Sequence, residues 1–130
     1  MSPNAAKTVI YVEDEPAVQR LVAFWLEDAG FTVLLAGDGA AGMDLIRSTV
    51  PDLVVTDALM PVVTGDELVE QLQGDPELRH IPIIMATAAA SPTRVRKMLA
   101  LGCRAVVPKP LDEDSFLYAV NAALDEVAQS

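Results

Sequence analysis

The sequence predicts an α/β protein in which a five-stranded parallel sheet carries helices on both faces. Two observations support this fold class. Five short, nearly continuous apolar runs, typical of strands covered on both faces, alternate with segments whose apolar residues recur every three or four positions. The links between them are short, and repeated strand–helix units with short links build parallel sheets through right-handed crossovers.

The five expected strands are rich in valine, isoleucine and leucine. They cover residues 8–12, 32–36, 53–56, 81–86 and 105–107. A helical pattern follows each of them. The first helix begins behind Pro16, which suits an early helical position, and Gly30 can close it. Its expected buried stripe consists of Val18, Leu21, Val22, Trp25 and Leu26.

The other four helices differ in how clearly their ends are marked. The second and third have weaker patterns, over 39–49 and 64–74. The fourth opens at Ser91-Pro92 and ends at Gly102, and the fifth begins at Asp112 with acids in its first turn, where the helix dipole favours them. The expected buried residues are Val95, Met98 and Leu99 in the fourth helix and Phe116, Val120, Ala123, Leu124 and Val127 in the fifth.

Length and composition restrict the class of protein. The 130 residues predict one domain over 1–130, with its core at about 7–127 and no residues left for an output domain. A single cysteine, an N-terminus without an apolar signal region and the lack of a membrane-spanning run predict a cytoplasmic protein without membrane insertion. The net charge of −10 argues against direct nucleic-acid binding.

Polar side chains follow four of the expected strands. They are Glu13, Asp14 and Glu15 after the first strand, Asp57 after the third, Thr87 after the fourth and Lys109 after the fifth. Ligands of open α/β sheets bind beyond the carboxyl ends of the strands, where the strand order reverses. The order 2-1-3-4-5 makes the first and third strands neighbours there and brings Asp14 and Asp57 together, so we predict this order.

These residues lie in motifs that resemble response-regulator receiver domains of two-component signalling, of the stand-alone, chemotaxis-regulator-like type. The resemblance runs from about residue 7 to 127 and rests on VIYVEDE, PDLVVTDALMPVVTG, DPELRHIP, IPIIMATA and LGCRAVVPKP. It implies a flavodoxin-like receiver fold and a phosphorelay protein that accepts a phosphoryl group on Asp57 from a histidine kinase or phosphotransfer protein. It also implies a cis peptide between Lys109 and Pro110.

The chemistry of these side chains is consistent with that role. Clustered carboxylates repel one another, so a cation is needed to hold them together, and oxygen ligands suit Mg2+. The resemblance implies direct coordination of Mg2+ by Asp14, Asp57 and the backbone carbonyl of Leu59, with Glu13 acting through water. The Thr87 hydroxyl and the Lys109 ammonium would then contact phosphoryl oxygens, since phosphoryl transfer depends on positioning and charge neutralisation.

Two rival functions can be weighed on the sequence. Gly37, Gly39 and Gly42 form a GxGxxG pattern followed by Asp57 twenty residues on, which in form is a dinucleotide-binding fingerprint. That fingerprint belongs after the first strand of its fold, whereas here it follows the second. A phosphatase with an aspartate nucleophile needs a second acid two residues later, and Leu59 stands there. We therefore expect no enzyme beyond catalysis of the protein's own phosphorylation and dephosphorylation.

The sequence departs from the family pattern where the resemblance would place a switch. Val106 stands where an aromatic ring usually moves inward, and Pro108 precedes Lys109. We expect the signal to pass through Thr87 and the backbone of the fourth and fifth strands. A downstream protein target is expected on a mixed-charge face that runs from Arg94 to Asp114.

Overall fold

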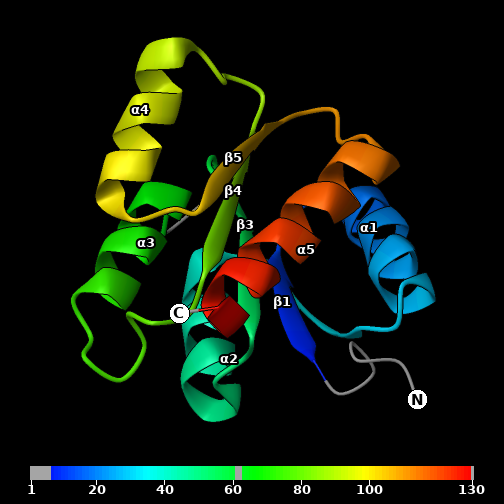
Figure 1. Ribbon diagram of the computed structural model, residues 1–130, viewed down its shortest axis with the longest axis horizontal. Helices are drawn as coiled ribbons and strands as arrows, with labels where there is room; N and C mark the ends of the chain where they lie inside the picture. Colours follow the sequence, from blue (N-terminus) through cyan, green and yellow to red (C-terminus); the bar gives the residue numbers. More distant parts are fainter. Residues whose placement is uncertain (1–6, 61–62, 130) are drawn as a thin grey trace.

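A single parallel sheet with the order β2-β1-β3-β4-β5 forms the centre of the molecule, as the sequence predicted (Figure 1). The computed structural model describes residues 7–60 and 63–129, with side chains described up to residue 125. The strands are β1 (Thr8–Val12), β2 (Thr32–Ala36), β3 (Leu53–Asp57), β4 (Ile83–Thr87) and β5 (Ala105–Pro108). The helices are α1 (Pro16–Asp28), α2 (Gly39–Thr49), α3 (Gly65–Gln73), α4 (Pro92–Leu101) and α5 (Glu113–Gln129).

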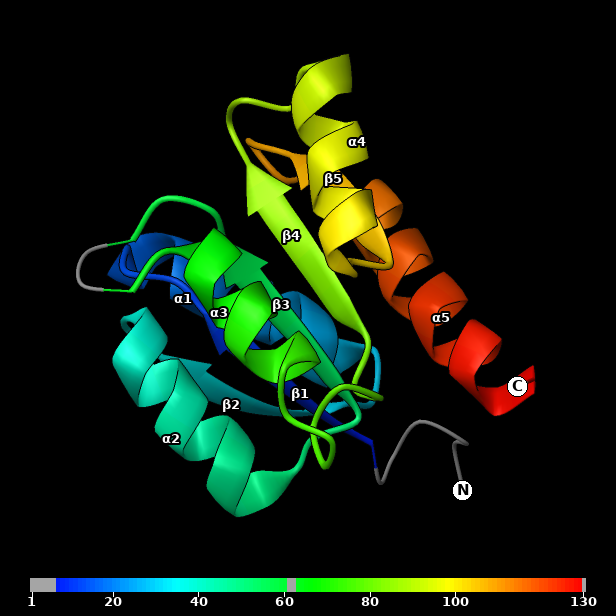
Figure 2. The same cartoon turned by 90° about the vertical axis from the view of Figure 1, so that its left-hand side faces the viewer.

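The helices cover both faces of the sheet, with α1 and α5 on one face and α2, α3 and α4 on the other (Figures 1 and 2). Side chains of a strand point alternately to its two faces, so each strand contributes to two separate clusters. Ile10 and Val54 pack toward α2, α3 and α4, whereas Val9 and Val55 pack toward α1 and α5. None of the helices in the described residues is long and apolar enough to span a membrane.

The helix ends follow the predicted signals. Ser91 accepts a hydrogen bond from the Arg94 amide at 3.2 Å, and Asp112 accepts one from the Ser115 amide at 2.9 Å. Thr64 forms a capping box with Glu67 at the start of α3, which explains why this short helix begins where it does.

Some of the burial predictions were wrong. Leu21 is 50% exposed and Leu99 is 45% exposed, although both fit the apolar stripe of their helix. A stripe of this width extends beyond the line along which the helix touches the sheet, so its edge residues remain in solvent. Val22, Leu26 and Met98 are fully buried, as predicted. The side chain of Val127 lies outside the described residues.

The GxGxxG segment has a packing role. The Asp38 side chain accepts a hydrogen bond from the Ala41 amide at 2.8 Å and caps α2. A Cβ atom at Gly39 would lie 2.5 Å from the Val63 carbonyl oxygen, and one at Gly42 would lie 2.9 Å from a Val12 methyl group. These glycines permit α2 to pack closely, and they follow edge strand β2 rather than the strands at which the order reverses.

Candidate functional site

An acidic cluster lies where β1 and β3 end side by side. Val12 is paired in register with Thr56, so the residues that follow these two positions meet at the same edge of the sheet. Glu13, Asp14 and Asp57 each place one carboxylate oxygen there, and these oxygens lie within 4.8 Å of one another. The structure thus brings Asp14 and Asp57 together, as the strand order predicted, with Glu13 beside them.

The three carboxylates differ in their exposure to solvent. Glu13 is 1% exposed and Asp57 is 7% exposed, whereas Asp14 is exposed. Asp57 is itself the last residue of β3, one position beyond the predicted end of that strand. A buried carboxylate needs a partner to offset its lost hydration. The two buried acids therefore require a nearby cation, and Asp14 does not.

Lys109 supplies that cation from the end of β5. Its ammonium nitrogen lies 2.6 Å from Glu13 Oε1 and 3.1 Å from Asp57 Oδ2, and its side chain is 19% exposed. Burial lowers the pKa of Lys109, but its hydrogen bonds to the two carboxylates outweigh burial and raise the pKa above the ordinary value. The lysine is therefore charged at neutral pH. Its peptide bond to Pro110 is cis, as expected.

Tyr11 is a member of this cluster that the sequence analysis missed. It lies within β1 and is fully buried, and its hydroxyl donates a hydrogen bond to Glu13 Oε1 at 3.2 Å. Burial, followed by the charge of Glu13, raises the pKa of Tyr11 well above its usual value. A signal was present in the sequence, because residues two apart in a strand point to the same face and Tyr11 stands two before Glu13.

Thr87 is the last residue of β4, the strand that pairs with β3. It is 2% exposed, and its hydroxyl oxygen accepts a hydrogen bond from the Ala89 amide at 3.1 Å. It lines a pocket of about 260 Å³ together with Leu59, which is 72% exposed. Asp57 therefore contacts the partly buried Lys109 ammonium, and the neighbouring strand β4 ends in a hydroxyl that lines open space.

Arg94 lines this pocket and forms an ion pair that the sequence did not predict. Its guanidinium donates hydrogen bonds to both carboxylate oxygens of Asp66, at 2.9 Å and 2.5 Å. The bidentate pair joins the start of α4 to the first turn of α3. Arg94 is thus paired across the helices and is not a freely solvated charge.

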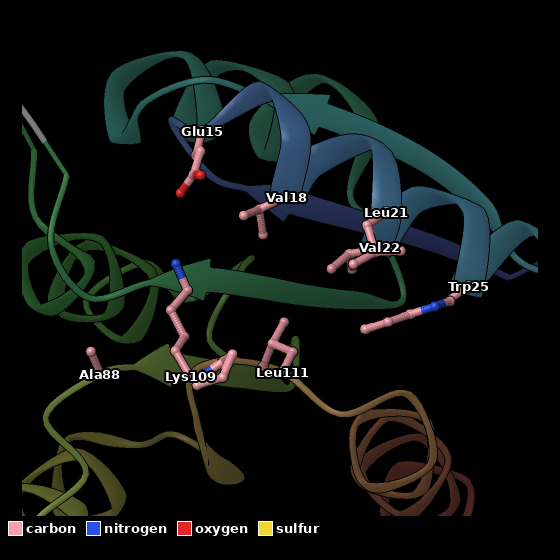
Figure 3. A pocket seen from close by; sticks show the side chains of 9 residues that line it. Glu15, Val18, Leu21, Val22, Trp25, Ala88, Lys109 and Leu111 are labelled. Carbon is pink, nitrogen blue, oxygen red and sulfur yellow. The ribbon is translucent and has the colours of Figure 1, made fainter.

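A second hollow adjoins the site on the side of α1. This groove of about 350 Å³ lies between α1 and the segment that follows β5, and it is mostly apolar (Figure 3). Val18, Leu21 and Trp25 line it from α1, opposite Leu111. Lys109 stands at one end of the groove and extends toward the loop that carries Glu15 (Figure 3). Leu21, which the sequence predicted to be buried in the core, thus lines this groove instead.

The backbone beside Asp57 leaves no room for a side chain at Gly65. The Gly65 amide donates to the Ala58 carbonyl at 3.0 Å, and a Cβ atom on Gly65 would lie 2.4 Å from the Asp57 carbonyl oxygen. A glycine is therefore required for the loop after β3 to return this close to the strand.

The donor set suits a hard divalent cation. All the ligand atoms that Glu13, Asp14 and Asp57 offer are carboxylate oxygens, which Mg2+ prefers over the nitrogen and sulfur ligands that bind zinc. An exposed Asp14 leaves one side of the cluster open to water, and Mg2+ commonly retains several waters. These residues fit Mg2+.

Residues 9–121 match the family model described as the response regulator receiver domain. The chain is 39% identical over 112 residues to hybrid signal transduction histidine kinase D of Dictyostelium discoideum, covering 86% of this chain but only 7% of the kinase. It is 32% identical over 120 residues to the polar-differentiation response regulator DivK of Brucella anthropi, covering 92% of this chain and 98% of that protein.

Solved structures show the same similarity. The signal receiver domain of a signal transduction histidine kinase from Syntrophus aciditrophicus superposes with a TM-score of 0.87 at 30% identity, covering 96% of this chain and 95% of that one. The chemotaxis response regulator CheY4 of Vibrio cholerae gives a TM-score of 0.86 at 27% identity, covering 91% and 98%.

Proposed function

The chain belongs to the response-regulator receiver domain family of two-component systems, and from this premise we propose that Asp57 is its phosphoryl acceptor. One observation carries the assignment. Among the described residues, Asp57 alone combines three features: it contacts the Lys109 ammonium, it belongs to the acidic cluster, and it ends a strand that neighbours the one carrying Thr87. The dinucleotide-binding alternative is not supported, because Gly39 and Gly42 are explained by the close packing of α2 and the motif follows edge strand β2.

In the proposed reaction an Asp57 carboxylate oxygen attacks the phosphorus atom of the donor. The bond from phosphorus to the donor's nitrogen or oxygen breaks as the new phosphorus–oxygen bond forms, and the donor leaves with the electron pair. The Lys109 ammonium neutralises part of the charge on the phosphoryl oxygens, and the Thr87 hydroxyl donates a hydrogen bond to one of them. The test is incubation with acetyl phosphate and Mg2+. One base-labile phosphoryl group per chain is expected by intact mass, and an unmodified chain would contradict the proposal.

We propose that Mg2+ is held by Asp14, Asp57 and the backbone carbonyl of Leu59, with Glu13 acting through water. When bound, the ion neutralises part of the charge that develops on the phosphoryl group. The protein's own contribution is to hold three carboxylates close together before the ion arrives, at the cost of their mutual repulsion.

Asp14→Asn is expected to raise the melting temperature of the metal-free protein while abolishing its stabilisation by Mg2+. The substitution removes the exposed member of a repelling cluster and leaves the pairs of Lys109 in place. For the parent, Mg2+ at one hundred times its Kd should stabilise the fold by about 2.7 kcal/mol. Thermal melts with and without Mg2+ measure both effects, and a parent insensitive to Mg2+ would contradict the metal site.

Turnover of phosphate esters is not part of the proposed function. Leu59, at the position where a phosphatase would carry an acid, has no proton to donate to a leaving group. We propose that catalysis is confined to the protein's own phosphorylation and dephosphorylation, within a single receiver domain that acts in the cytoplasm.

The family interacts with histidine kinases or phosphotransfer proteins, and for this chain we propose such a donor, together with a downstream protein that binds the face from Arg94 to Asp114. Lys97, which is 62% exposed, gives this face a positive charge, and Glu113 and Asp114 lie in the first turn of α5. Such a mixed-charge surface favours a protein partner over nucleic acid.

Beryllofluoride, which mimics the phosphoryl group, is expected to shift the amide NMR signals of residues 87–114. The added charge draws the Thr87 hydroxyl inward, and β4 transmits the shift to its neighbour β5. Val106 is half-buried and too small to exchange much volume, so the shifts should be modest. Changes confined to α1 and α2 would place the output elsewhere.

A further inference from the structure

We propose that Tyr11 is a positioning residue for phosphoryl transfer, whose hydroxyl holds the Glu13 carboxylate and eases the release of Lys109 toward the incoming phosphoryl group. This inference rests on the proposed function, because Lys109 gains a phosphoryl oxygen to contact only if Asp57 accepts the group.

Both carboxylate oxygens of Glu13 accept hydrogen bonds. Its Oε1 accepts two of them, one from the Tyr11 hydroxyl at 3.2 Å and one from the Lys109 ammonium at 2.6 Å. Its Oε2 accepts one from the Glu15 amide at 3.1 Å. Tyr11 and Lys109 therefore share one carboxylate oxygen.

The Glu13 carboxylate is buried where it contacts Lys109. The Lys109 ammonium contacts both Glu13 and Asp57, so a movement of the ammonium toward a phosphoryl group on Asp57 lengthens its bond to Glu13. Glu13 is 1% exposed, so bulk solvent has little access to its Oε1 when the ammonium moves away. A buried acceptor left without a donor is costly. The Tyr11 hydroxyl remains on the same oxygen and reduces that cost.

A single substitution can separate the contribution of the Tyr11 hydroxyl from that of its ring. The ring packs within the cluster between the sheet and the α1–α5 layer, and phenylalanine would preserve that packing. Tyr11→Phe removes the hydroxyl alone. Tyr118, the other tyrosine of the chain, is 77% exposed on α5, so Tyr118→Phe is a matched control.

The kinetic experiment measures the rate of phosphorylation by acetyl phosphate at saturating Mg2+. Tyr11→Phe is expected to lower this rate about fivefold, as loss of one hydrogen bond worth about 1 kcal/mol implies, with an unchanged Kd for Mg2+. Tyr118→Phe should match the parent. A parental rate in Tyr11→Phe, or a loss seen only as weaker Mg2+ binding, overturns the inference. An unlabelled parent overturns the proposed function as well.

A second experiment needs neither Mg2+ nor a phosphoryl donor. Urea unfolding of Tyr11→Phe, Glu13→Leu and the double variant forms a double-mutant cycle. Tyr11→Phe should shift the unfolding equilibrium about fivefold in the parent and produce no loss of stability in the Glu13→Leu background, where the hydroxyl has lost its acceptor. An equal loss in both backgrounds would show that Tyr11 acts through packing, and would overturn the inference even if Asp57 is phosphorylated.

Discussion

Asp57→Asn is expected to lower phosphorylation by acetyl phosphate at least about a hundredfold, because a carboxamide oxygen is a far weaker nucleophile than a carboxylate. Asparagine keeps the size of the side chain, so the fold around it should persist. The substitution also removes one of two buried charges that share a single lysine. The variant should therefore be at least as stable as the parent without Mg2+.

The measurement compares the base-labile label per chain in Asp57→Asn and Asp44→Asn. Asp44 is exposed on α2, outside the acidic cluster, so its substitution is a matched control that should label like the parent. Label at the parental level in Asp57→Asn would refute the assignment. If both variants lost the label, the loss would reflect a general defect in the variant proteins and not the removal of the acceptor carboxylate.

Lys109→Met is expected to destabilise the metal-free protein by about 3 kcal/mol at pH 7, since it leaves two buried carboxylates without a cation. This value lies at the lower end of the range for removing one partner of a buried ion pair, because the lysine side chain is 19% exposed. The matched control is Lys97→Met. Lys97 is 62% exposed and lies 3.9 Å from Asp66, so its loss should cost less than about 0.5 kcal/mol.

The stability difference between the parent and Lys109→Met should depend on pH, because the pKa of Lys109 is raised in the folded protein. A lysine whose folded pKa exceeds its unfolded value of about 10.4 adds stability that is fully present below that pH and is lost as pH rises through the folded pKa. Urea unfolding should thus show that the free energy of unfolding differs between the parent and Lys109→Met by a constant amount from pH 7 to about 10. Above that pH the difference should become smaller. Equal losses in Lys109→Met and Lys97→Met would show that the buried pairs add no stability.

Local patterns were sufficient to predict the order of the elements and the place of the acids. The alternation of apolar runs with helical stripes predicted the sheet, and Asp14 and Asp57 were predicted to meet because parallel strands end at one edge. Strand ends were less accurate. Asp57 and Thr87 proved to be the last residues of β3 and β4, since backbone pairing with a neighbouring strand sets where a strand ends.

The sequence by itself determined the fold class, the strand order and the acids, because residue spacing distinguishes strands from helices and the acids directly follow the apolar runs that form the strands. The tertiary structure alone decided which charges pair. Arg94 and Asp66 are 28 residues apart, and Lys109 and Glu13 are 96 apart, so no local period connects them. The exposure of Leu21 and the contact of the Tyr11 hydroxyl with Glu13 likewise depend on distances between elements, which helix packing sets and periodicity does not encode.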